Sequence, residues 1–422
     1  MPGVFQTLGN VVRVLVIDPL SSGPELVSHL EKQGHDVLSY FQDEPAAAAE
    51  AWTETVVETA LQGLALTSGF DHIIAGSDYG VVAAEVLAAR AGLPCNDPEL
   101  IWARRDKDAM VLACGQAGLR VPQSWRITSV DQIEAIRPEV ARLANGVVVK
   151  PASSAGSDSC IICHSEEEIR EVVSGLLGKV NLLGVRNTSC IVQERIVGEQ
   201  YFVNTVTTDA EHLVTEFFVY GLLEQDGRPH IYNAITLPES GELFETARDF
   251  AFAVNDALGV RFGASHTEMR LTPEGWVLIE YNGRSMGPVV PDEVYLPARG
   301  FSQISLWADC IAGGVRKAAA VKDRGQAEHC VAWHMPQPTH SGVLVSTHWE
   351  LLEQLPSFSL VARQPAPGEI VDLYNRVTTA SHGLVFFSGP STEEVVQDLQ
   401  QARLMELDGA LFTMAPATPA HV

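Results

Sequence analysis

The stretch that decides the fold is residues 264–284, ASHTEMRLTPEGWVLIEYNGR. Two runs typical of β-strands flank Pro273-Glu274-Gly275. Proline suits the first corner of a type I turn, and glycine suits the left-handed position that closes a three-residue hairpin loop. The stretch therefore predicts an antiparallel β-hairpin.

A three-residue loop also predicts the register of this hairpin. Counting outward from the loop gives the pairs Thr272–Trp276, Arg270–Leu278, Glu268–Glu280 and His266–Asn282. Side chains alternate along a strand, so one face is expected to carry His266, Glu268, Arg270, Glu280 and Asn282.

The pair Glu268–Glu280 is unusual, because two carboxylates directly opposite each other, with Cβ atoms roughly 5 Å apart, repel. A cation between them would remove the repulsion. Carboxylate and amide oxygens suit a hard cation such as Mg²⁺, which also binds phosphate. The alternative is a solvated hairpin face with incidental acids, and the metal hypothesis needs phosphate-binding groups elsewhere in the chain.

Composition limits the class of protein. A chain of 422 residues is expected to form two or three domains, and 46% hydrophobic with 19% charged residues is typical of globular proteins. The formal charge of −25 repels polyanions, so binding to nucleic acids or anionic membranes is not expected.

The seven cysteines show no disulfide framework. Cys160 and Cys163 have the spacing of a redox motif, but they lie in a strand-like run and are expected to be structural thiols on opposite faces. There is no run of about 20 apolar residues and no secretory leader pattern, so we expect a soluble cytoplasmic protein.

The first hundred residues alternate strands with helices. Strands are predicted at 11–17, 36–40 and 70–75, with helices at 24–34, 46–66 and 80–91. This alternation predicts a small open parallel sheet. No GxGxxG follows the first strand, so a dinucleotide site is not supported.

Two lysines stand out downstream. Lys107 is the single cation in an amphipathic helical segment that Asp106 is expected to start, and a solvated lysine is the alternative. Lys150 ends an apolar strand, and the small-residue loop 152–158 follows it. Such a loop can fold its backbone N–H groups onto phosphate oxygens, although it can also be a plain surface hairpin. The Walker pattern is absent.

Two further segments complete the chain. Residues 190–206 read as strand, turn at Gly198 and strand, with Glu194 and Glu199 flanking the turn. Residues 329–422 contain short strands, many prolines and a closing helix that Ser391 or Thr392 is expected to cap.

The order of Lys107, Lys150 with its loop, and Glu268…Glu280-Tyr-Asn282-Gly-Arg284 resembles the ATP-grasp superfamily, over roughly residues 70–310. The ending ExNGR, which is Glu280 to Arg284 in the segment IEYNGR, is the most specific part of the resemblance. Together with GASHTE, it is most similar to carboxylate–amine ligases that join L-amino acids into dipeptides. Biotin-carboxylase-like members share the same skeleton.

The resemblance implies an ATP site. Lys107 and Lys150 would contact phosphates, and the loop would close over the triphosphate. Glu194 and the backbone through Val197 would meet the adenine, and Glu199 would lie near the ribose. The residues implied in ATP binding are Lys107, Lys150, Ser153, Ser154, Gly156, Ser157, Glu194, Arg195, Ile196, Val197, Glu199, Glu268 and Glu280.

The resemblance also implies metal and substrate sites. Glu268, Glu280 and Asn282 would hold two Mg²⁺ ions, for which Mn²⁺ can substitute, with Glu280 bridging. Arg284 would lie on the transferred phosphoryl group or the substrate carboxylate, so the implied catalytic residues are Lys150, Glu280 and Arg284. Gly287 is a further expected substrate contact. His266 does not match an invariant metal ligand of the superfamily, so its expected substrate contact is inferred from its position on the shared hairpin face.

The expected activity is ATP-dependent joining of a carboxylate, an L-amino acid, to an amine through an acyl phosphate, with release of ADP and phosphate. A biotin-carboxylase-like enzyme and a non-catalytic nucleotide-binding module are the alternatives. The expected partners are small molecules and, by default, a second copy of the chain.

The expected fold combines α/β and α+β domains. An N-terminal open parallel α/β domain spans 1–105. An ATP-grasp core of two α+β lobes that grip ATP spans 106–310, with a mobile lid at about 120–205. A small C-terminal α+β domain spans 311–422.

Overall fold

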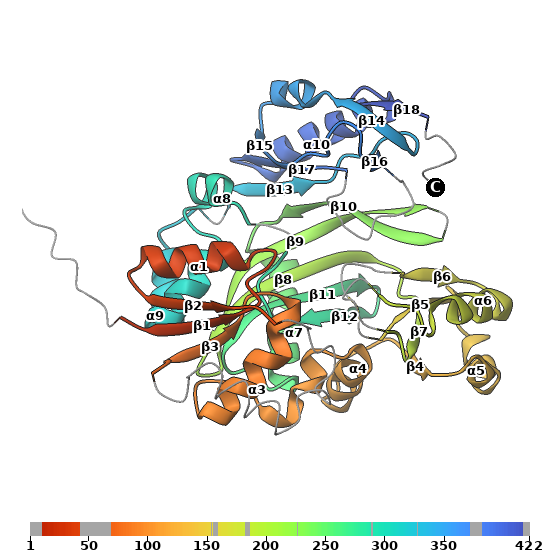
Figure 1. The fold of residues 1–422 in the computed structure, drawn as a ribbon, viewed down its shortest axis with the longest axis horizontal. Coiled ribbons are helices and arrows are strands. Elements are labelled where there is room, and N and C mark those ends of the chain that lie inside the picture. Colours follow the sequence, from red (N-terminus) through yellow and green to blue (C-terminus); the bar gives the residue numbers. More distant parts are fainter. Residues whose placement is uncertain are drawn as a thin grey trace, which may run out of the picture.

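The computed structural model describes residues 11–42, 69–152, 154, 159–181, 186–225, 227–287, 290–326, 328–371 and 382–416. The expected helix at 46–66 lies outside these residues, as do three expected ATP-binding residues, Ser153, Gly156 and Ser157. Figure 1 shows a small parallel sheet on one side, a large sheet in the middle, a small lobe on the opposite side and the C-terminal elements above.

The N-terminal sheet is parallel, as predicted, with the order β2-β1-β3. Its strands are β1 (Arg13–Ile17), β2 (Asp36–Tyr40) and β3 (His72–Ala75), and its helices are α1 (Gly23–Lys32) and α3 (Val81–Ala91), with the short 3₁₀ helix η2 (Asp78–Gly80) before α3. Val14 to Ile17 are fully buried, because helices and the large sheet cover β1.

The segment between α3 and the next helix contains two 3₁₀ turns, η3 (Pro98–Leu100) and η4 (Trp102–Arg104). The buried Arg104 holds this region by donating to the carbonyls of Asp97 (2.8 Å) and Leu258 (2.5 Å) and by pairing with Glu85. Helix α4 (Lys107–Gln116) follows. Asp106 caps it as predicted, accepting from two backbone N–H groups of the first turn.

The small lobe is a four-stranded antiparallel sheet in the order β4-β7-β5-β6. Its elements are β4 (Ser124–Ile127), η5 (Val130–Gln132), α5 (Ile133–Val140), β5 (Val147–Pro151), β6 (Ile161–Cys163), α6 (Glu166–Leu176) and β7 (Cys190–Glu194). The two helices pack on one face of the sheet and give the lobe its own hydrophobic core. It projects from the rest of the molecule in Figure 1.

The large sheet has eight strands in the order β12-β11-β8-β9-β10-β13-β17-β15. Their bounds are β8 (Glu199–Thr208), β9 (Glu211–Gln225), β10 (Arg228–Thr236), β11 (Gly263–Thr272), β12 (Gly275–Asn282), β13 (Cys330–His334), β15 (Phe358–Arg363) and β17 (Leu384–Gly389). Helices α7 (Gly241–Ala257), α8 (Asp292–Arg299) and α9 (Gln303–Lys322) pack against it.

The C-terminal region adds a second sheet, β16-β14-β18, and two helical segments. The elements are β14 (Gly342–Thr347), η6 (Trp349–Gln354), β16 (Ile370–Val371), α10 (Thr392–Leu407) and β18 (Phe412–Ala415). The Ser391 side chain caps α10 by accepting from the Glu394 N–H (3.3 Å).

Two expected boundaries fall within these elements. Residue 310 lies inside α9, and the large sheet continues beyond it through β13, β17 and β15. The expected lid end near 205 lies inside β8, which pairs in the large sheet, whereas the strands of the small lobe end at Glu194. Strand pairing between distant segments joins the elements on the two sides of each expected boundary.

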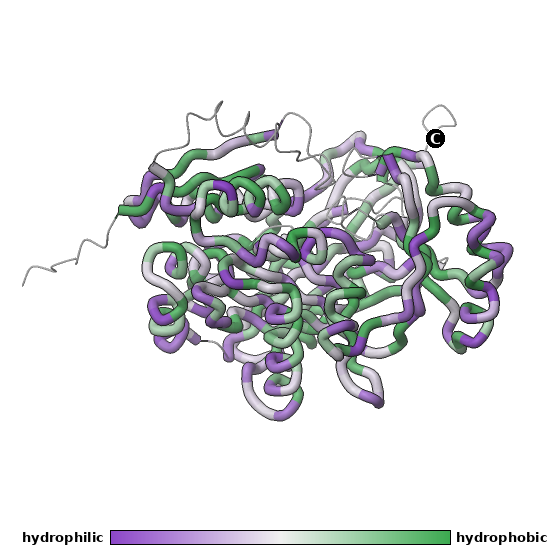
Figure 2. The backbone as a smooth tube through the Cα atoms, turned by 90° about the horizontal axis from the view of Figure 1, so that it is seen from below, coloured by the Kyte–Doolittle hydropathy of each residue, from purple (hydrophilic) through white to green (hydrophobic). Residues whose placement is uncertain are grey.

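Figure 2 shows hydrophilic residues interrupting the hydrophobic ones throughout the described chain. In agreement with this mixture, none of the helices in the described ranges is long and apolar enough to cross a bilayer.

Candidate functional site

The central hairpin β11–β12 has the predicted inner pairs. Glu268 pairs with Glu280, and His266 pairs with Asn282. The outer part of the predicted register is wrong. Arg270 pairs with Val277, and Thr272 pairs with Gly275 across a two-residue turn.

A β-bulge explains why the inner pairs are still correct. The turn is one residue shorter than expected, and the register shifts by one residue between Glu268 and Met269, where β12 holds the extra residue Ile279. The two differences cancel beyond the bulge. Both Ile279 and Glu280 line the same cavity as a result.

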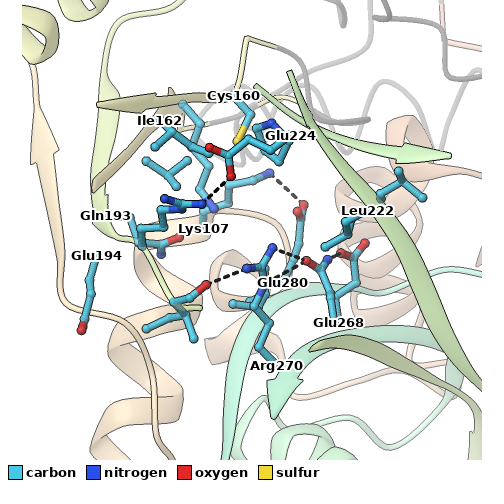
Figure 3. A pocket seen from close by; sticks show the side chains of 18 of the residues that line it. Lys107, Cys160, Ile162, Gln193, Glu194, Leu222, Glu224, Glu268, Arg270 and Glu280 are labelled. Atoms are coloured by element: carbon cyan, nitrogen blue, oxygen red, sulfur yellow. Dashed lines mark hydrogen bonds and ion pairs between the residues drawn. The ribbon is translucent and has the colours of Figure 1, made fainter. Parts of the chain in front are cut away.

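This cavity has a volume of about 290 Å³ and lies between the small lobe and the large sheet. One part of its wall is apolar, with Val148, Ile162, Ile196, Leu222, Leu223, Ile231 and Ile279. The other part carries polar and charged groups, including Lys107, Lys150, Gln200, Glu268, Arg270 and Glu280. Figure 3 shows the labelled members of both groups around the opening. Such a wall suits a ligand with a flat apolar end and an anionic end.

Two lysines act on Glu280 in this cavity. Lys107, at the start of α4, has its Nζ 2.9 Å from Glu280 Oε1 and also donates to the Ser154 carbonyl at 2.8 Å. Burial raises the pKa of Glu280, but Lys107 and Lys150 act more strongly together and lower it to about 2. Glu280 is therefore ionised at neutral pH.

Lys150 lies at the end of β5 and is buried. Burial lowers the pKa of Lys150, and Lys107 lowers it further, whereas the charge of Glu280 acts in the opposite direction. The structure thus brings both predicted lysines to one carboxylate, although Lys107, Lys150 and Glu280 come from three separate elements. A solvated surface position for Lys107 is excluded, because only 9% of its side chain is exposed.

Glu268 is held by three side chains. Gln200 Nε2 donates to its Oε2 at 2.7 Å, His266 Nε2 lies 3.1 Å from its Oε1, and the Tyr220 hydroxyl donates at 3.5 Å. His266 is itself fixed, since its Nδ1 lies 2.9 Å from Asn204 Oδ1. Sequence patterns had not indicated Gln200 or Tyr220, because their contacts depend on the pairing of β8, β9 and β11.

Arg270 links the hairpin to the segment after β7. Its guanidinium donates to the Ile196 carbonyl at 2.6 Å and to Gln200 Oε1 at 2.9 and 3.1 Å. Burial and the nearby Arg195 lower the pKa of Arg270. The sequence predicted the hairpin face on which Arg270 lies, and the structure adds that Arg270 fixes the Ile196 backbone in the cavity wall.

The segment from Glu194 to Ile196 lines the cavity. The Glu194 carboxylate turns away from the opening, as Figure 3 shows, and accepts from the Gln123 N–H at 3.1 Å. Its backbone is therefore the part that faces a ligand. Arg195 forms an ion pair with Glu224 of β9, which connects the two lobes at the cavity wall.

Gln200, the neighbour of Glu199 in β8, lines the cavity wall, whereas Glu199 does not. Glu199 accepts from the Tyr201 hydroxyl at 2.8 Å. Alternation along β8 explains the difference, because neighbouring residues point to opposite faces. Val197 is 52% exposed and is not part of the wall either.

Arg284 lies beside the cavity rather than in its wall. Its Nε donates to Asp78 Oδ2 at 2.9 Å, and Nη1 donates to the Ser285 carbonyl at 3.1 Å. Burial lowers the pKa of Arg284, but Asp78 and Glu280 outweigh this effect and raise it. Gly287 lies against Ser21 of the loop after β1, where a Cβ atom would be 2.7 Å from Oγ.

The expected metal ligands are partly assembled. Glu268 and Glu280 line one cavity, and Asn282 is two residues further along β12, paired with His266. Within the described residues, no cluster of three or more His, Cys, Asp or Glu side chains forms a complete metal site. The two carboxylates nonetheless form a donor set that suits a divalent cation bound together with an anionic ligand.

The thiols of Cys160 and Cys163 point to different surroundings. Cys163 is buried in the core of the small lobe, whereas Cys160 lines the cavity. Both are free. Burial raises the pKa of each thiol, so neither is an activated nucleophile. The expectation of a structural thiol therefore describes Cys163 better than Cys160.

Comparison with known proteins gives four informative matches. Residues 143–292 match the family model of the ATP-grasp domain. Dapdiamide A synthase of Enterobacter agglomerans is 28% identical over 320 residues, which are 72% of this chain and 74% of that protein. The L-amino acid ligase of Bacillus licheniformis has a similar structure, with a TM-score of 0.72 at 17% identity, covering 97% of this chain and 100% of that one.

The fourth match is the biotin carboxylase domain of the 2-oxoglutarate carboxylase from Hydrogenobacter thermophilus, in complex with MgADP, ADP and bicarbonate. Its TM-score is 0.61 at 12% identity, covering 97% of this chain and 92% of that one.

These matches indicate the class of protein: residues 143–292 match the ATP-grasp domain, and the multidomain fold of the chain is similar to that of the L-amino acid ligase. Within that class, it is similar to the L-amino acid ligase group.

Proposed function

We propose that this chain is an ATP-dependent carboxylate–amine ligase that joins an L-amino acid to an amine and releases ADP and phosphate. The observation that carries the proposal is the presence of Lys107, Lys150, Glu268 and Glu280 in one cavity that also has several apolar lining residues. The apolar residues suit a nucleobase, and the charged residues suit a triphosphate with divalent metal.

The residues present fit ATP and Mg²⁺. Glu280 is ionised at neutral pH, and Glu268 is held facing it. Glu268, Glu280 and Asn282 would hold one or two Mg²⁺ ions, with Mn²⁺ as a substitute. When bound, the metal offsets charge on the triphosphate. Lys107 is expected to exchange its contact with Glu280 for phosphate oxygens, and Lys150 adds a second positive charge there.

The apolar part of the wall would hold the adenine against the backbone of residues 194–196. Arg270 keeps that backbone in place through the Ile196 carbonyl. Gln200, which occupies the wall position expected for Glu199, is the candidate for a ribose contact. Ser154 and the neighbouring loop would cover the triphosphate and keep water away from the reacting groups.

The reaction needs an activated carboxylate, because a carboxylate ion is a poor electrophile at neutral pH. A carboxylate oxygen attacks the terminal phosphorus of ATP, the bond to the ADP oxygen breaks, and an acyl phosphate forms. The amine then attacks the acyl carbon, loses a proton and displaces phosphate. Arg284 presents a planar fork to the transferred phosphoryl group or the substrate carboxylate. His266 and Gly287 are proposed substrate contacts on the same side.

A screen for ADP release tests this proposal. Pairs of L-amino acids are expected to stimulate ADP release, whereas single amino acids stimulate it weakly. Stimulation by bicarbonate alone would instead support the carboxylase alternative, which the similarity to a biotin carboxylase domain favours. Nucleotide binding without turnover under any condition would support a non-catalytic module.

An isotope experiment then tests the route. With an ¹⁸O-labelled carboxylate, one label should appear in inorganic phosphate for each amide formed, because the carboxylate oxygen that attacked phosphorus leaves with it. Pyrophosphate among the products would contradict the proposal and indicate adenylation. The unlabelled carboxylate is the control for background phosphate.

A further inference from the structure

The N-terminal domain packs directly against the end of the central hairpin. A Cβ atom on Gly283 would lie 3.7 Å from Val81 Cγ1 at the start of α3. Gly287 approaches Ser21 in the loop after β1. Residues 283–287 therefore lie against the carboxyl ends of β1 and β3. In parallel sheets, that edge is where functional loops gather.

Asp78 makes the polar contact in this junction. It belongs to η2, directly after β3, and accepts from Arg284 Nε at 2.9 Å across 206 positions of sequence. The pair is largely shielded from water, with 20% of the Asp78 side chain and 16% of the Arg284 side chain exposed. A shielded charge-assisted hydrogen bond fixes an arginine more firmly than an exposed ion pair does.

The loop that carries Asp78 is held tightly in place. A Cβ atom on Gly76 would lie 2.5 Å from Pro19 Cα, and one on Gly80 would overlap the Ile17 carbonyl oxygen. These contacts press the loop against the end of β1. Asp78 is thus presented from a rigid support, which is what a residue needs in order to orient another side chain.

The contacts of Arg284 are also directional. Nε is bound to Asp78, and Nη1 is bound to the Ser285 carbonyl. Among the described residues, Nη2 has no hydrogen-bond partner, and the charges that act on Arg284 include that of Glu280 from the cavity. Two of the five guanidinium N–H groups are therefore held by described residues, and the two N–H groups on Nη2 have no partner among those residues.

We propose that Asp78 is a positioning residue that orients the Arg284 guanidinium toward the phosphoryl or carboxylate group at the reacting end of the site, so that the N-terminal domain completes the site. This inference rests on the proposed function, because it takes Arg284 as the anion-binding residue. The competing explanation is an ion pair that only joins two domains.

The test compares Asp78→Asn with Asp292→Asn. Asp292 of α8 forms the matched interdomain contact with His29 of α1, at 2.7 Å. A joining role predicts similar effects of the two substitutions on unfolding and activity. A positioning role predicts that Asp78→Asn lowers kcat for amide formation by about 10-fold or more, with KM for ATP within about twofold. Asp78→Glu should restore part of kcat, because it keeps the charge.

A binding measurement separates this inference from the proposed function. The probe is inorganic phosphate, titrated calorimetrically into the full chain saturated with MgADP. Asp78→Asn and Arg284→Lys should each weaken phosphate binding by about 10-fold, with MgADP affinity unchanged, and the double variant should be no weaker than Arg284→Lys alone.

The outcomes are distinguishable. If phosphate binding behaves as described but no amino-acid pair supports ligation, Asp78 still positions Arg284 and the proposed ligase activity is wrong. If ligation occurs and Asp78→Asn matches Asp292→Asn in kcat and phosphate affinity, the positioning role is overturned. Equal loss of MgADP and phosphate affinity in Asp78→Asn would also overturn it, because that pattern indicates general damage.

Discussion

The most informative single change is Glu280→Gln, which removes one charge while conserving shape. Glu280 lies 2.9 Å from the Lys107 ammonium and also lowers the energy of the buried Lys150 charge. The lysines lower its pKa from 4.5 to about 2 despite burial. A shift of two to three pKa units corresponds to about 3 kcal/mol in favour of the ionised carboxylate.

Glutamine imitates the protonated carboxyl, so the variant should lose about 2–3 kcal/mol of stability at pH 7, somewhat less than the full shift because water reaches the cavity. Urea unfolding of the nucleotide-free protein, followed by tryptophan fluorescence, measures this loss. The matched control is Glu274→Gln in the turn of the same hairpin, where 70% of the side chain is exposed. We expect the control to change stability by less than about 0.5 kcal/mol.

The pH dependence follows from the direction of the shift. The pKa of Glu280 is lower in the folded chain than in the unfolded chain. The ionised Glu280 therefore contributes its full stabilisation of the folded chain above the unfolded-state pKa of 4.5. This stabilisation is lost as the pH falls toward the folded-state pKa of about 2. The stability difference between wild type and Glu280→Gln should be constant from pH 8 to 5 and then shrink.

The same variant tests the proposed metal site. With a carboxylate lost from the metal-binding pair, turnover should fall by several orders of magnitude even when ATP is saturating, and added Mg²⁺ should not restore it. Equal stability of Glu280→Gln and Glu274→Gln at pH 7 would refute the electrostatic reasoning. Near-normal turnover of Glu280→Gln would refute the metal assignment.

Two further predictions concern the small lobe. Amide hydrogen exchange in Val147–Pro151 and Ile161–Cys163 should slow when ATP and Mg²⁺ are added, because closure over the phosphates protects both strands, and unchanged exchange would mean that the lobe does not cover the nucleotide. Alkylation of Cys160 by iodoacetamide at pH 8 should be slow in the native chain, because burial raises the pKa of this thiol, and MgATP should slow it further. Peptide mapping with Cys160→Ser as the control identifies the adduct. An alkylation rate that does not change when MgATP is added would place Cys160 outside the nucleotide site.

Several features of the site could be predicted from local patterns. Strand alternation placed His266, Glu268, Glu280 and Asn282 together, and the observed pairs agree. The β-branched run of β1 and the helices after each strand predicted the parallel sheet, which the structure confirms. Asp106 was recognisable as a helix cap. Such signals are readable because they depend on periodicity, caps and turns within short stretches of the sequence.

Local sequence patterns did not predict the features that depend on strand register or on contacts between distant segments. The two-residue turn and the bulge at Ile279 were missed, because a bulge depends on how β11 packs against β8 as well as on the hairpin itself. The sequence also does not say which face of β8 lies toward the cavity, where Gln200 rather than Glu199 lines the wall.

The sequence by itself therefore determined which residue types are present and which of them share a strand face. The tertiary structure alone decided that Lys107, Lys150 and Glu280 meet, that Arg270 holds the Ile196 carbonyl, and that Asp78 reaches Arg284. The physical reason is that alternation and capping arise from neighbouring residues, whereas these contacts join separate elements. These contacts form only when the burial of apolar side chains in several hydrophobic cores brings the elements together.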